Sequence, residues 1–142
     1  MNNVSYKQAT ILLVEDDDID AKIVERAFQK LRIANTIIRA TDGVMALEFL
    51  KDGTVSRPYI ILLDLNMPKM GGLEMLKELR ADKNLNNSIV FVLTTSKDDE
   101  DKIAAYNHNI AGYIVKEKLQ NGFDELVKLL DYYWRIVELP EH

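Results

Sequence analysis

Residues 59–72 read YIILLDLNMPKMGG, and the rest of the chain can be interpreted outward from them. The apolar run that begins at Tyr59 is typical of a strand buried on both faces of a sheet. It ends on Asp64, and Asn66, Pro68 and two glycines follow as loop residues. In an open α/β sheet, a carboxylate at the carboxyl end of a strand points into the crevice where ligands bind. The stretch therefore predicts a central strand that carries an acidic group into a binding crevice.

The composition is typical of one globular domain. The 142 residues are 47% hydrophobic and 29% charged, which suffices for a sizeable core. The formal net charge of −5 argues against a nucleic-acid or acidic-membrane partner held by bulk electrostatics. The sequence contains no cysteine, so it excludes disulfides, thiol catalysis and cysteine-ligated metal. No apolar run is long enough to span a membrane and no secretory signal opens the chain, so we expect a cytoplasmic protein.

Strand and helix patterns alternate five times along the chain. Apolar runs predict strands over 10–14, 36–40, 59–63, 89–93 and 112–115. Helical periodicity and capping residues predict helices over about 18–31, 43–53, 73–82, 98–108 and 123–137. Parallel strands need crossover connections, and the helices supply them. The pattern predicts a doubly wound α/β sandwich, with residues 1–142 as a single domain and no separate output domain.

Apolar residues at helical spacing are expected to face the core. In the first two helices these residues are Ile23, Val24, Ala27, Phe28, Leu31, Val44, Ala46, Leu47 and Leu50.

The last helix has a wider apolar surface than one core face needs. Its main stripe comprises Phe123, Leu126, Val127, Leu130, Tyr133, Trp134 and Val137, and it is widened by Leu129, Tyr132 and Ile136. A large exposed apolar patch usually marks a partner site. The alternative is that this helix folds back over its own core.

Polar side chains follow four of the predicted strands. They are Glu15 and Asp16, Asp64, Thr94 and Lys116. Carboxylates gathered in one crevice repel one another unless a cation lies among them, and Mg²⁺ suits oxygen ligands of this kind. An ammonium and a hydroxyl beside them are suited to binding phosphoryl oxygens, so Asp64 is a plausible nucleophile that forms an acyl phosphate. Taken singly, these residues are also explained as helix caps, a strand-end hydroxyl or a surface lysine, so the prediction depends on their combination and order.

With these motifs in order, the chain resembles a two-component response-regulator receiver domain over residues 11–130. The resemblance is carried by the acidic pair Glu15-Asp16, the Asp64-Leu-Asn66-Met-Pro68 loop, Thr94-Thr95 and the Gly112-to-Lys116 segment. It implies a flavodoxin-like five-stranded parallel sheet with five helices and strand order 2-1-3-4-5.

The resemblance also implies a role for each site residue. Asp64 would accept a phosphoryl group from a histidine kinase. Glu15, Asp16, Asp64 and the backbone carbonyl of Asn66 would hold Mg²⁺. Lys116 would pair with the phosphoryl group, and the Thr94 hydroxyl would move toward it and draw Tyr113 inward as the switch aromatic. Such a protein is not an enzyme beyond catalysing its own phosphorylation and dephosphorylation.

Two positions depart from the family pattern. Glu117 stands where the family often has a proline after the lysine, commonly with a cis peptide bond, and Gly71 stands where it often has an acid. A cis bond before a non-proline residue is costly, so the geometry after Lys116 is expected to differ.

The C-terminal features are similar to those of the stand-alone phytochrome-associated response regulators. That resemblance implies a sensor histidine kinase partner, such as a bacterial phytochrome, and a homodimer formed through the last helix. The interface would include Leu129, Tyr132, Tyr133, Trp134 and Ile136. The apolar residues Ile19 and Ile23 are candidates for docking the kinase, with core burial as the alternative for Ile23.

Several rival functions remain open at this point. A haloacid-dehalogenase-type enzyme also uses a strand-end aspartate with Mg²⁺, but it requires a second acid two residues later, where this chain has Asn66. A flavin or nucleotide binder would need a glycine-rich phosphate loop, and neither common motif is present. The remaining alternatives are a phosphorelay intermediate that passes phosphate to a histidine phosphotransfer protein, and a receiver-fold adaptor that is never phosphorylated.

Overall fold

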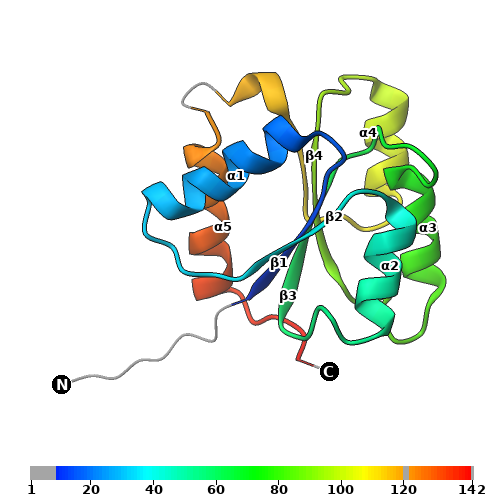
Figure 1. Ribbon diagram of the computed structural model, residues 1–142. Helices are drawn as coiled ribbons and strands as arrows, with labels where there is room; N and C mark the ends of the chain where they lie inside the picture. The colour runs from blue at the N-terminus through cyan, green and yellow to red at the C-terminus, as the bar shows by residue number, and fades with distance from the viewer. Residues whose placement is uncertain (1–8, 120–121, 142) are drawn as a thin grey trace.

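The described part of the chain, residues 9–119 and 122–141 of a computed structural model, forms one parallel sheet with helices on both faces (Figure 1). The strands are β1 (Thr10–Val14), β2 (Ile37–Ala40), β3 (Tyr59–Leu63), β4 (Ile89–Thr94) and β5 (Gly112–Val115). The helices are α1 (Asp18–Lys30), α2 (Gly43–Lys51), α3 (Gly72–Ala81), α4 (Asp99–Tyr106) and α5 (Asp124–Ile136). The strand order is β2-β1-β3-β4-β5, which confirms the predicted doubly wound fold. The ends of the predicted domain, residues 1–8 and 142, lie outside the described residues.

Strand β3 lies at the centre of the sheet, and all five of its residues are buried. Its last residue, Leu63, is in register with Val14 of β1 and with Val92 of β4. Parallel pairing in this register brings the residues that follow β1 and β3 to the same edge of the sheet. The sheet therefore places Glu15 beside Asp64 although they are distant in the sequence.

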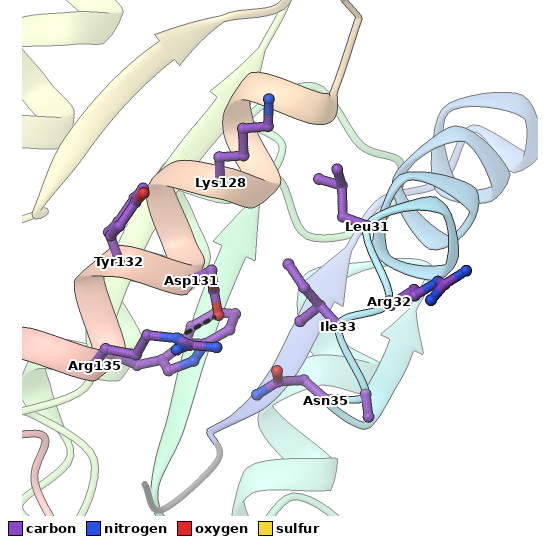
Figure 2. A pocket seen from close by; sticks show the side chains of 10 residues that line it. Leu31, Arg32, Ile33, Asn35, Lys128, Asp131, Tyr132 and Arg135 are labelled. Carbon is purple, nitrogen blue, oxygen red and sulfur yellow. Dashed lines mark hydrogen bonds and ion pairs between the residues drawn. The ribbon is translucent and has the colours of Figure 1, made fainter.

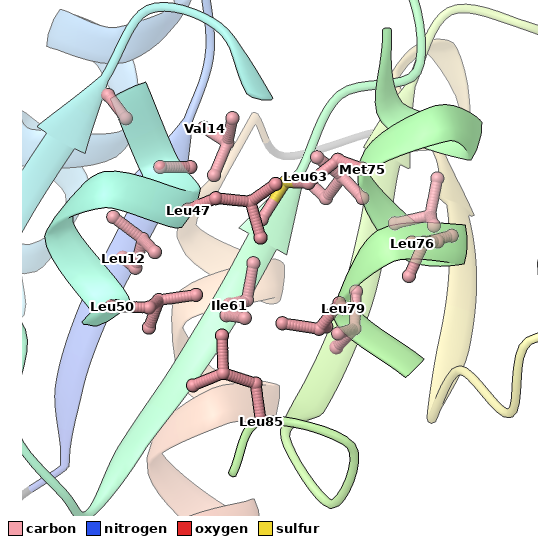
Figure 3. Packing of buried hydrophobic residues seen from close by; sticks show 14 of the residues in the cluster. Leu12, Val14, Leu47, Leu50, Ile61, Leu63, Met75, Leu76, Leu79 and Leu85 are labelled. Carbon is pink, nitrogen blue, oxygen red and sulfur yellow. The ribbon is translucent and has the colours of Figure 1, made fainter. Parts of the chain in front are cut away.

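Two hydrophobic layers hold the helices against the sheet. Helices α2, α3 and α4 cover one face, where Leu12, Leu47, Ile61 and Leu79 pack together (Figure 3). Helices α1 and α5 cover the other face. There the ring of Phe28 stacks on Trp134, with centroids 6.4 Å apart. Burial of these apolar side chains supplies most of the favourable free energy of folding.

Two residues of the first two helices that were predicted to face the core are exposed to solvent. Ile23 is 39% exposed and Val44 is 41% exposed. Successive residues of a helix are rotated by about 100°, so Ile23 lies beside the buried stripe that Val24 defines and not within it. The prediction of core positions was therefore wrong at the edges of the apolar stripes.

A glycine allows the loop between β3 and α3 to pack closely against the first residue of α3. A Cβ atom on Gly72 would lie 2.6 Å from the carbonyl oxygen of Asp64 and 2.8 Å from the Cα atom of Leu65. Both atoms belong to the backbone, so they cannot move aside as a flexible side chain can. Gly72 thus permits α3 to begin directly against the loop that carries Asp64.

A short 3-10 helix, η1 (Lys116–Lys118), follows β5 and was not predicted from the sequence. Within the residues described, none of the helices has both the length and the apolar character needed to cross a bilayer.

Candidate functional site

Three carboxylates meet at the carboxyl edge of the sheet. Glu15, Asp16 and Asp64 each offer a carboxylate oxygen, and these oxygens all lie within 4.8 Å of one another. Glu15 and Asp64 are buried, whereas Asp16 is exposed to solvent. The backbone N–H of Asn66 donates to Oδ1 of Asp64 at 3.3 Å, which orients that carboxylate. Hard oxygen ligands at this spacing fit a divalent cation such as Mg²⁺, and such a cation would neutralise the crowded charge.

Lys116 extends from the end of β5 into the same crevice. Its Nζ atom donates to Oε1 of Glu15 and to Oδ2 of Asp20, both at 2.6 Å. Burial by itself would lower the pKa of the Lys116 ammonium, but the hydrogen bonds to Asp20 and Glu15 and the charges of Glu15 and Asp64 outweigh it and raise the pKa. The side chain is therefore a fixed cation beside Asp64.

Asp20 was not identified from the sequence. It lies in the first turn of α1, four residues after Asp16, which precedes the helix. The available signal was the continuation of the acidic run into the start of α1.

The carboxyl group of Glu15 has a strongly shifted pKa. Burial raises its pKa from 4.5 to about 7, with a further contribution from the charge of Asp64, and the hydrogen bond from Lys116 only partly opposes the shift. The folded chain therefore binds a proton at Glu15 more tightly than the unfolded chain does. Stability from this group is fully present below pH 4.5 and is lost as the pH rises through about 7.

This shift predicts a pH-dependent metal affinity. Mg²⁺ binds the deprotonated carboxylate, so at about pH 6 it must displace a proton and should bind about tenfold more weakly than at about pH 8. Thermal unfolding with and without saturating Mg²⁺ should show the larger stabilisation at the higher pH. Glu15→Gln is the matched control, because it removes the titrating group and should leave a stabilisation that differs little between the two pH values.

Thr94 and Tyr113 are connected through Ser96. The fully buried Thr94 ends β4, and its Oγ1 atom accepts a hydrogen bond from the backbone N–H of Ser96 at 3.3 Å. The Tyr113 hydroxyl donates to the Ser96 carbonyl at 3.0 Å. Burial is the main cause that raises the pKa of Tyr113, so the phenol stays protonated. Ser96 was not identified from the sequence, because the connection depends on the shape of the loop after β4.

The two departures from the family pattern have clear structural positions. Within the described residues the only cis peptide bond precedes Pro58, so the bond between Lys116 and Glu117 is trans. Glu117 forms an ion pair with Lys97, across the gap between the loops that follow β5 and β4. Gly71 is the N-cap residue of α3 and contributes no side-chain cap.

The residues predicted to form a dimer interface differ in their exposure to solvent. Leu129, Tyr132 and Ile136 are exposed, at 47%, 65% and 78%. Tyr133 is half-buried, with its ring edge-on to Phe91 at 5.1 Å. Trp134 is only 6% exposed, so its assignment to an exposed surface is corrected: it belongs to the core of its own chain.

A groove lies beside the exposed residues of α5. It has a volume of about 520 Å³ and separates α5 from the loop between α1 and β2 (Figure 2). The side chains of Tyr132, Lys128 and Arg135 come from α5, and Arg135 is paired with Asp131 at 3.0 Å. The opposite wall consists of residues 31–35.

The fold and the crevice together define a class of protein: a doubly wound domain with an acidic cation site and a lysine at the carboxyl edge of its sheet. A family model described as the response regulator receiver domain matches residues 11–130. The chain belongs to this family.

Individual relatives agree with this assignment. Response regulator Rcp1 of Synechocystis sp. is 34% identical over 145 residues, which cover 99% of this chain and 99% of that protein. Chemotaxis protein CheY-3 of Vibrio cholerae is 34% identical over 134 residues, covering 89% of this chain and 100% of that protein.

Solved structures show the same similarity. The Mn²⁺-bound form of Rcp1 superposes with a TM-score of 0.81 at 34% identity, over 93% of this chain and 99% of that chain. The phosphorylated cyanobacterial phytochrome response regulator RcpA superposes with a TM-score of 0.84 at 31% identity, over 94% of this chain and 99% of that chain.

Proposed function

We propose that this chain is a single-domain signalling switch that accepts a phosphoryl group on Asp64 from the phosphohistidine of a sensor histidine kinase. The observation that carries the proposal is the juxtaposition of three carboxylates with the ammonium of Lys116 in one crevice. A purely structural role for Asp64 would not require two further acids within 4.8 Å of it.

The roles of the residues follow from their chemistry. An oxygen of Asp64 attacks phosphorus, so an O–P bond forms while the N–P bond of the phosphohistidine breaks and the imidazole of the kinase leaves. Glu15, Asp16, Asp64 and the carbonyl of Asn66 would hold Mg²⁺, which would neutralise charge on the phosphoryl oxygens.

The switch depends on a second set of residues. Lys116 and Thr94 bind the phosphorylated site better than the free one, and Tyr113 follows Thr94 as the switch aromatic. The chain catalyses only its own phosphorylation and dephosphorylation.

The test is intact-mass spectrometry of the full chain after incubation with acetyl phosphate. We expect the mass of one phosphoryl group to be gained with Mg²⁺ and none to be gained after chelation. Equal labelling with and without the metal would contradict the proposed site.

The proposed partner is a phytochrome-type histidine kinase in the cytoplasm, with no nucleic acid or membrane partner. The proposal is supported by similarity to RcpA and to the bacteriophytochrome response regulator AtBRR, which is 28% identical with a TM-score of 0.73. On α1, Ile19 is 71% exposed and Ile23 is 39% exposed, so both are available to a kinase helix. Phosphotransfer from a panel of labelled histidine kinases would identify the cognate kinase, and a second transfer to a histidine phosphotransfer protein would identify a relay.

We also propose that the chain forms a homodimer through Leu129, Tyr132 and Ile136 of α5. Large exposed apolar side chains on one helix usually mark a partner site. The double variant Leu129→Glu/Ile136→Glu should shift the protein from dimer to monomer in multi-angle light scattering. Ile103→Glu on α4, where Ile103 is 60% exposed, makes the same chemical change outside the surface and should leave the dimer intact. A monomeric wild type, measured at high concentration with beryllofluoride present, would contradict the dimer.

A further inference from the structure

Asp20 is the second carboxylate that binds the site lysine. Its Oδ2 atom lies 2.6 Å from Nζ of Lys116, and the Lys116 and Asp20 side chains are only 10% and 25% exposed. Asp20 is held in place by α1, where its backbone N–H donates to the N-cap side chain of Asp17 at 3.2 Å. The contact therefore joins the start of α1 to the end of β5 through one ion pair.

Asp20 differs from Glu15, the other acid on Lys116, in what else it can bind. Glu15 belongs to the group of three acids suited to a cation, and Asp20 is not a member of that group in the described chain. When a cation occupies the site, Glu15 has a second positive partner, whereas the only cation paired with Asp20 among the described contacts is Lys116. Asp20 is thus the acid that depends most on keeping the lysine.

Phosphorylation would create a competitor for the same ammonium. An acyl phosphate on Asp64 carries more negative charge than the carboxylate it replaces, so it attracts the Lys116 ammonium more strongly. Movement of Nζ toward the phosphoryl group would lengthen its 2.6 Å contact with Asp20. If Lys116 leaves Asp20, a partly buried carboxylate loses its counter-charge, which is unfavourable. A contact made in only one of two states shifts the equilibrium toward that state.

We propose that Asp20 is a positioning residue that competes with the phosphoryl group for Lys116 and thereby limits the population and lifetime of the phosphorylated state. This inference rests on the proposed phosphorylation of Asp64. It predicts that removing the charge of Asp20 strengthens binding at Asp64, whereas structural damage to the site would weaken it. The sign of the effect therefore separates competition from a merely structural role.

The test compares beryllofluoride affinity by calorimetry, at saturating Mg²⁺, for the full-length wild type and three variants. Asp20→Asn keeps the size of the side chain and removes its charge, and we expect binding about fivefold tighter, the scale of one partly exposed ion pair. Asp20→Glu keeps the charge and should bind nearly as the wild type does. Asp18→Asn removes the same charge in the same helical turn, where Asp18 pairs with Arg39 and not with Lys116, and should change the affinity little.

The lifetime of the acyl phosphate, after removal of acetyl phosphate, provides an independent readout. Asp20→Asn should prolong it, and Asp18→Asn should not. Equal or weaker beryllofluoride binding by Asp20→Asn, or an equal gain in Asp18→Asn, would overturn the inference and leave the proposed function standing. If the wild type takes up neither beryllofluoride nor phosphate, both proposals fail together.

Discussion

Asp64→Asn is expected to abolish labelling by acetyl phosphate, reducing the phosphorylated fraction from most of the protein to background in intact-mass spectra. The amide nitrogen and oxygen of asparagine cannot form a stable acyl phosphate, because the side chain lacks a carboxylate nucleophile. The substitution preserves the size of the side chain and can retain the hydrogen bond from the N–H of Asn66. The fold should therefore remain intact while the chemistry is lost.

Two further measurements make this result decisive. Asp64→Asn removes one of the charges that raise the pKa of Glu15, so the variant without metal should be at least as stable to heat as the wild type. It should also gain less stability from Mg²⁺, since one ligand is missing. Asp99→Asn on α4 is the matched control and should be labelled like the wild type. Undiminished labelling of Asp64→Asn would place the phosphate elsewhere and refute the assignment.

Gly72→Ala is expected to lower the free energy of unfolding by about 3 kcal/mol, at the upper end for overpacking a close contact. The new Cβ would lie 2.6 Å from the backbone oxygen of Asp64 and 2.9 Å from Cδ2 of Leu65. Gly72 opens α3, where alanine is otherwise the better residue by about 1 kcal/mol. Without the steric contact the substitution would stabilise the protein, so the sign of the measured change tests the close approach directly.

The neighbouring glycine provides the control. A Cβ on Gly71 would have one contact, at 3.4 Å with the carbonyl oxygen of Leu65, and the residue has φ −73°, which any residue adopts. Gly71→Ala should therefore change stability by less than about 1 kcal/mol in urea unfolding. Phosphorylation should be impaired in Gly72→Ala and preserved in Gly71→Ala, because only the former moves the backbone of Asp64. A Gly72→Ala variant as stable as Gly71→Ala would contradict the structure at this position.

The position of the three acids at one edge of the sheet could be predicted from local sequence. A strand buried on both faces needs a continuous apolar run, as in Tyr59–Leu63, and the residue after it must lie at the edge of the sheet. The acidic residues Glu15, Asp16 and Asp64 were therefore identifiable before their distances were known. Their mutual approach followed from one general property of parallel sheets, in which the carboxyl ends of the strands share an edge.

The contacts of long side chains could not be predicted in the same way. Lys116 was expected to face the site, but its bond to Asp20 joins residues that are 96 positions apart. Ser96 connects Thr94 to Tyr113 through backbone groups whose positions depend on the loop after β4. A sequence pattern specifies the side chain at each position but not the direction in which an irregular loop presents its backbone.

The sequence by itself determined the order of strands and helices, the apolar core of the sheet and the acids at its carboxyl edge, because each follows from a short repeating pattern. Only the tertiary structure decided which apolar residues of α5 are exposed to solvent. Trp134 packs against Phe28 of α1, while Leu129, Tyr132 and Ile136 remain exposed. The physical reason is that burial depends on the neighbouring helix, and the partner of each helix face is fixed only when distant segments pack together.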